Sequence, residues 1–171
     1  MYSFPAWRRA PFIALLIIIF VIAYAPATAQ GTATIRLAAL TSPSNISHLY
    51  ISISSIQLHQ EGFLNWTTIS QTFPTVDLVS PSTQSTPQTI ISTPVHSGRY
   101  DSIKIFFTNS TVSIGGQNQA VAAPHSINTN TTLLVAPNGV GDLLLVVAFD
   151  YASLYETPPS LSFVLVSVSA A

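Results

Sequence analysis

The chain has 171 residues, no cysteine, 6% charged residues and a formal net charge of −1. A soluble domain typically devotes about a quarter of its residues to charge, which keeps its copies apart in solution. This composition excludes a basic surface for nucleic acid and a fold that depends on disulfide bonds. The polar surface must therefore consist mainly of hydroxyls and amides.

Residues 1–29 have the features of a secretory signal peptide. Arg8 and Arg9 precede an apolar run over 12–25, and Ala27-Thr28-Ala29 supplies small residues for cleavage. A membrane-spanning helix needs about 20 apolar residues, so a retained anchor is the poorer interpretation. We predict a cleaved signal over 1–29, a single domain over 30–171, an extracellular or cell-surface location and no membrane span after cleavage.

The rest of the sequence alternates between apolar and polar residues, which predicts β-strands. The first of them, 32–40, has its apolar side chains at Ala33, Ile35, Leu37 and Ala39. A second run over 49–58 changes phase near Ser54-Ser55, which predicts a β-bulge or a bend there. The further predicted strands are 63–69, 75–79, 89–95, 100–107, 111–114, 119–122, 126–135, 142–149 and 161–168.

Turn signals separate the predicted strands. Gly115-Gly116 predicts a tight hairpin, 80–87 an exposed loop, and 151–156 the one short helical turn. Short strands at close spacing predict an all-β fold, a two-layer antiparallel β-sandwich of jelly-roll or immunoglobulin-like Greek-key type. The run 143–149 lacks alternation, which predicts a central strand covered on both faces.

Several short motifs occur in a recognisable order. They are Leu49-Tyr50-Ile51-Ser52-Ile53-Ser54-Ser55-Ile56-Gln57-Leu58-His59, Asn65-Trp66-Thr67-Thr68, Val76-Asp77-Leu78, Ser97-Gly98-Arg99-Tyr100-Asp101-Ser102-Ile103-Lys104, Val121-Ala122-Ala123-Pro124-His125 and Val147-Ala148-Phe149-Asp150. Over residues 32–150 the chain resembles a secreted domain-of-unknown-function family of archaea and bacteria. Thr41-Ser42-Pro43 replaces the Asp-Ala-Pro usual in that family. The resemblance implies a secreted β-sandwich and no enzymatic activity.

The overall organisation is also similar to archaeal bundling-pilus and thread subunits and to TasA-like biofilm fibre proteins. In such fibres an N-terminal strand of one subunit inserts into the next, where it gains backbone hydrogen bonds and buries alternate side chains. We therefore expect 32–40 to be a donor strand for a homopolymer, with Ala33, Ile35, Leu37 and Ala39 entering the acceptor groove. The alternative is that it forms the first strand of its own sandwich.

The last predicted strand, 161–168, is apolar on both faces. Such a strand is either buried in the centre of a sheet or available to a partner, and central burial is the safer interpretation. An uncharged strand of this kind at a bare sheet edge would favour pairing with other chains.

Four N-glycosylation sequons begin at Asn45, Asn65, Asn109 and Asn130. Glycans at these positions would supply hydration that charge does not. Asn45 and Asn109 lie at predicted turns and are the better candidates, whereas Asn65 lies in a predicted strand.

The sequence offers no catalytic pattern. His48, His59, His96 and His125 lack metal-ligand spacing, and there is no nucleophile elbow or phosphate loop, so we expect neither an enzyme, a metal nor a cofactor. Asp77, Arg99, Lys104 and Asp150 are expected to be buried or structural polar groups. Calcium at Asp142 or Asp150 is a weaker alternative because a loop with several acidic ligands is missing.

Two classes of function remain. The first is a structural subunit of an extracellular filament that assembles through strand 32–40. The second is a monomeric secreted or cell-surface module that binds carbohydrate or cell wall, with Trp66, Tyr50, Tyr100 and Tyr151 as candidate stacking residues.

Overall fold

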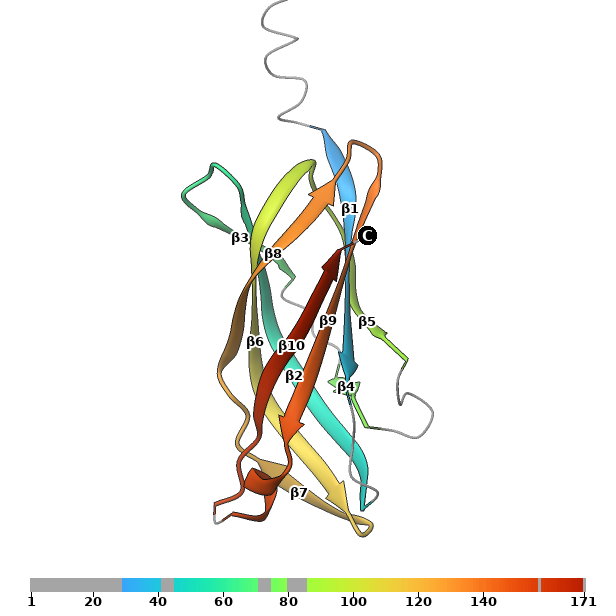
Figure 1. Cartoon of the computed structure of the whole chain (residues 1–171), viewed down its shortest axis with the longest axis vertical. Helices are drawn as coiled ribbons and strands as arrows, with labels where there is room; N and C mark the ends of the chain where they lie inside the picture. The colour runs from blue at the N-terminus through green and yellow to red at the C-terminus, as the bar shows by residue number, and fades with distance from the viewer. Residues whose placement is uncertain (1–28, 41–44, 71–74, 80–85, 157, 171) are drawn as a thin grey trace, which may run out of the picture.

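The computed structural model describes residues 29–40, 45–70, 75–79, 86–156 and 158–170. Two β-sheets pack against each other, which confirms the all-β sandwich (Figure 1). Residues 1–28, Thr41-Ser42-Pro43 and most of the predicted loop 80–87 lie outside the described residues. Within the described part of the chain, no helix has the length and hydropathy needed to span a membrane.

The first sheet has the strand order β10-β9-β1-β5. Its strands are β1 (Gln30–Ala39), β5 (Gln88–His96), β9 (Val140–Asp150) and β10 (Ser162–Ala170). β5 and β10 pair antiparallel with their neighbours, but β1 runs parallel to β9. This parallel pair is a departure from the predicted antiparallel sandwich.

The second sheet is entirely antiparallel and is built on two long strands, β2 (Ile46–Gln60) and β6 (Gly98–Ile114). The strands β3 (Trp66–Ser70) and β4 (Thr75–Asp77) pair with β2, while β7 (Gln117–Val121) and β8 (Ser126–Val135) pair with β6. The β2–β6 register shifts between Ser52 and Ser55, which confirms the predicted bulge.

Two turns that the sequence predicted are present in the structure. Gly115 and Gly116 have φ angles of 57° and 80° and close the β6–β7 hairpin, since two consecutive positive φ angles favour glycine. A 3-10 helix, η2 (Ala152–Tyr155), forms within the predicted helical turn. The predicted strands 100–107 and 111–114 are one continuous strand, because β6 continues through 108–110.

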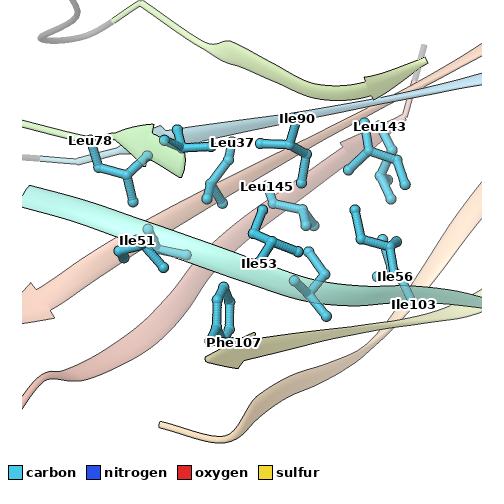
Figure 2. Packing of buried hydrophobic residues seen from close by; sticks show 14 of the residues in the cluster. Leu37, Ile51, Ile53, Ile56, Leu78, Ile90, Ile103, Phe107, Leu143 and Leu145 are labelled. Carbon is cyan, nitrogen blue, oxygen red and sulfur yellow. The ribbon is translucent and has the colours of Figure 1, made fainter. Parts of the chain in front are cut away.

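The core lies between the sheets, where alternate side chains of both sheets meet. Figure 2 shows Leu143 and Leu145 of the first sheet beside Ile51, Ile53 and Ile103 of the second. All five are at most 2% exposed. Because strand side chains alternate between faces, this single apolar layer accounts for the period-2 pattern of the sequence.

Two expectations about strand environment were wrong. β9 is central in its sheet, but its side chains alternate between buried and half-buried positions, because a two-layer sandwich covers only one face of each sheet. β10 is an edge strand that pairs with β9 alone in its sheet, rather than a centrally buried strand. Its apolar composition therefore does not reflect a position between two other strands.

Candidate functional site

The most distinctive site in the fold is the groove that β1 occupies between β5 and β9, which we call the β1 groove. β1 pairs with β5 from Gln30 to Leu37 and with β9 from Thr32 to Ala39. Both backbone edges of the strand are thus satisfied by neighbours. In the single chain, β1 is accordingly a strand of its own sandwich.

The inward face of β1 contributes directly to the core. Ala33 and Ile35 are completely buried, Leu37 is 2% exposed and Ala39 is half-buried. These four are the side chains that the sequence assigned to an acceptor groove. Because they already lie in the groove of their own chain, they define the shape and apolar character that any β1 strand bound there must match.

Close backbone contacts fix the beginning of β1. The Thr32 amide donates to the Gly139 carbonyl at 2.8 Å, and the Asn138 amide donates to the Gln30 carbonyl at 2.8 Å. A Cβ atom on Gly31 would lie 2.4 Å from the carbonyl oxygen of Ala136, so only glycine fits without movement of the β8–β9 turn. This end of the groove therefore accepts a strand only if it has glycine at the position of Gly31.

An ion pair fixes the register of β1 on the outer face. The Arg36 Nε donates to Asp142 Oδ1 at 2.9 Å, and a second guanidinium nitrogen donates to Oδ2. The side chains are 35% and 28% exposed, so solvent screens the pair only in part. A bidentate pair between β1 and β9 favours one strand register, because a shift moves the two groups apart.

The connectivity of β1 is unusual for a strand so well paired. β5 and β9 are both distant from β1 in sequence, and neither is joined to it by a hairpin. After β1 the Leu40 amide donates to the Val147 carbonyl at 2.9 Å, and the chain then passes to β2 in the opposite sheet. The strand pairing of β1 is therefore entirely non-local in sequence.

Asp77 is a structural carboxylate on the second sheet. Its oxygens accept hydrogen bonds from His48 Nδ1 at 2.6 Å and from the Leu49 and Val79 amides. Burial acts to raise the pKa of Asp77, but these hydrogen bonds outweigh burial and hold that pKa below its ordinary value. The sequence did not predict His48 as the partner.

The other three predicted polar residues are less buried than expected. Arg99 is 57% exposed and pairs with Glu61 at 3.1 Å. Asp150 is exposed and accepts a hydrogen bond from the Ala152 amide before η2. Lys104 lies half-buried with its Nζ 4.7 Å from the ring centroid of Trp66. Long side chains on an outer sheet face keep their charge in water, which explains these positions.

The predicted stacking aromatics do not form one platform. Tyr100 is 2% exposed and its hydroxyl donates to the His96 carbonyl, so it belongs to the core. Tyr50 stacks on His48 with 5.4 Å between ring centroids, and Tyr151 packs against Phe149. Of the four, Trp66 lies on the outer face of the second sheet, where it contacts Lys104 and His59.

A second histidine–aspartate pair lies beside Trp66. His59 Nδ1 and Asp101 Oδ1 are 2.7 Å apart, and the hydrogen bond from His59 lowers the pKa of Asp101. Two-residue pairs of this kind provide neither a nucleophile nor a set of metal ligands. Across the described residues, no group of three or more His, Asp or Glu side chains could hold a metal ion.

All four sequon asparagines are exposed, and Asn45 lies at a turn as predicted. Asn109 lies within β6, so its expected turn position was wrong, whereas Asn130 lies within β8, in agreement with the predicted strand 126–135. Asn65 lies outside any strand, at the bend just before β3, so its expected strand position was wrong. The Asn45 side-chain amide donates to the hydroxyl of Tyr155.

A family model described as a domain of unknown function (DUF4382) matches residues 32–153. The chain belongs to this family. The match begins within β1 and ends within η2, so it includes the β1 groove and the strands of both sheets except β10. It agrees with the first family resemblance of the sequence, whereas the resemblance to pilus and TasA-like proteins stays a prediction. No curated protein and no solved structure matches the chain.

Proposed function

We propose that the protein is a subunit of an extracellular filament in which the β1 strand of one copy occupies the β1 groove of the next. The observation that carries this proposal is that β1 is bound on both edges yet joined to neither neighbour by a hairpin. Any copy of the same strand, whichever chain supplies it, offers the same hydrogen bonds and side chains. Exchange of an identical element is a low-cost route to assembly.

The contacts of β1 support exchange in a specific register. The apolar face of Ala33, Ile35 and Leu37 supplies burial, and the Arg36–Asp142 pair supplies alignment. In an exchanged joint each of these contacts would connect two chains instead of one. The free energies of the monomer and of the strand-exchanged polymer would then differ mainly in three contributions. These are the conformation of the segment between β1 and β2, the entropy lost when chains associate, and new contacts between neighbouring subunits.

The positions of the end of β1 and the start of β2 support a particular joint. β1 ends beside Val147, and β2 begins beside Ile114, both at the end of the sandwich opposite to Gln30 (Figure 1). A strand donated in the same orientation would bring the two bodies together through this end. Non-reciprocal donation continues as an open chain of subunits, whereas reciprocal donation closes a dimer.

The charge distribution is compatible with close packing of copies. After residue 29 the chain has three Lys or Arg residues, and two of them, Arg36 and Arg99, are paired with carboxylates. Low residual charge weakens repulsion between neighbouring copies. The proposed export of the chain through its signal peptide would place such an assembly outside the cell.

A charge-reversal pair tests exchange directly. In the Arg36→Asp chain two carboxylates face each other across the groove, and in the Asp142→Arg chain two guanidinium groups do. Mixing the chains restores opposite charges at every joint between unlike chains. We expect electron microscopy to show fibres from the mixture and few from either variant alone.

The double variant R36D/D142R is the matched control, because its charges are complementary within one chain and between chains. It should form fibres without a partner. A mixture that behaves as the sum of its separate components would contradict the proposal. A wild-type protein that stays monomeric would instead favour the alternative of a monomeric secreted binding module.

A further inference from the structure

The turn between β2 and β3 exposes apolar side chains that the fold itself does not require. Phe63 is 61% exposed and Leu64 is 97% exposed. Figure 1 shows this turn projecting from the sandwich beside β3. Single exposed apolar side chains are common on protein surfaces, but two adjacent ones on a projecting turn offer an apolar surface for a contact outside the domain.

The sequon Asn65-Trp66-Thr67 begins in this turn and continues into β3, with Phe63 two residues before the asparagine. Asn65 and Thr67 are both exposed. The Phe63 amide donates to the Gln60 carbonyl at 3.1 Å, and Gly62 has a φ of 85°, which together define a tight turn. The aromatic ring and the acceptor amide therefore belong to one compact reversal of the chain.

The other sequons are held more firmly. Asn109 and Asn130 are paired with Ser52 and Ser102 within the β-ladders of the second sheet. The Asn45 amide is engaged by Tyr155. The Asn65 side chain makes no hydrogen bond to the part of the chain that the structure describes. Asn65 itself lies outside any strand, and backbone at a turn adapts to a modifying enzyme more readily than the backbone of a paired strand.

We propose that Asn65 carries an N-linked glycan and that its first sugar packs on the ring of Phe63. The side-chain nitrogen of Asn65 would attack the anomeric carbon of an oligosaccharide activated as a lipid-linked phosphate ester. A carbon–nitrogen bond forms, the carbon–oxygen bond to phosphate breaks, the phosphate leaves with the electron pair, and the amide loses one proton.

The apolar face of a pyranose ring matches the flat face of an aromatic side chain, as in other aromatic contacts that bury area with defined geometry. Packing of the sugar on Phe63 accounts for the exposed ring and secures the turn. The turn belongs to the second sheet, whereas β1 lies in the first, so the modification does not depend on strand exchange.

The test uses the protein exported by the cells that make it. Mass spectrometry of the peptide containing Asn65 should show an attached glycan, and Asn65→Gln should remove that mass. Phe63→Ser keeps the sequon intact. In the glycosylated chain it should lower Tm by about 2 to 4 °C, a shift expected for loss of one such contact in a domain of this size.

The same Phe63→Ser change in an Asn65→Gln background should leave Tm unchanged, because the sugar is already missing. Leu64→Ser is the matched control, since Leu64 is more exposed but not aromatic, and it should leave Tm unchanged in both backgrounds. Unmodified Asn65 in the exported protein, or an equal effect of Phe63→Ser with and without the glycan, would overturn the proposal.

Discussion

At the scale of single residues, the few charged groups form specific pairs. Arg36 pairs with Asp142, Arg99 with Glu61, His48 with Asp77 and His59 with Asp101. Three of the pairs join different strands, Glu61 lies in the turn that follows β2, and the partners of every pair are far apart in sequence. The sequence identified Asp77 as a polar group that needs a partner, but pairing depends on strand register, which alternation alone does not define.

Asp77 should make stability depend on pH in acid. Its pKa is lower in the folded chain than its ordinary value, so its contribution is present above the unfolded pKa and is lost as pH falls through the folded pKa. We expect Asp77→Asn to lower the free energy of unfolding at neutral pH and to reduce the loss of stability below about pH 4. Denaturant titrations at several pH values measure this.

Asp101→Asn is the control for that prediction. Asp101 also has a lowered pKa and a histidine partner, but it lies at the surface, where solvent weakens the interaction. Its substitution should change the acid profile less. Parallel profiles for Asp77→Asn and wild type would contradict the role assigned to Asp77.

At the scale of elements, the strands could be predicted because each covers one side of a single core. The range 32–40 agrees closely with β1, and the phase change near Ser54-Ser55 agrees with a bulge in β2. The order of the strands within each sheet could not be predicted from the alternation of apolar and polar residues. An apolar strand such as β10 has the same sequence pattern at an edge as in the centre, and the parallel β1–β9 pair depends on long-range contacts.

The apolar face of β1 should contribute strongly to stability. Ile35 is completely buried opposite the second sheet, so Ile35→Ala removes buried methyl groups and leaves a cavity. We expect the free energy of unfolding to fall by about 2 to 5 kcal/mol. Val140→Ala, on the neighbouring strand but 67% exposed, should change it by less than about 0.5 kcal/mol. Equal effects of the two substitutions in urea unfolding would contradict this account.

At the scale of the whole molecule, uncharged polar groups on the surface take the place of the missing charged residues. Hydroxyl and amide groups cover much of the outer face of the second sheet, while the first sheet contains a strand whose pairing is entirely non-local in sequence. Composition indicated that copies would repel each other weakly, and the fold indicates where an exchanged strand would fit. A glycan on Asn65 would add hydration on the second sheet's side without altering β1.

The central claim is that β1 of one copy fills the β1 groove of another. Thr34 and Ser92 lie opposite each other on β1 and β5 with their hydroxyl oxygens 3.1 Å apart, and the chain has no cysteine of its own. Cysteines introduced at both positions are therefore placed to form one defined disulfide. After oxidation of assembled T34C/S92C protein, strand exchange predicts a ladder of covalent multimers in a non-reducing denaturing gel. Exclusive formation of disulfides within single chains would contradict the claim.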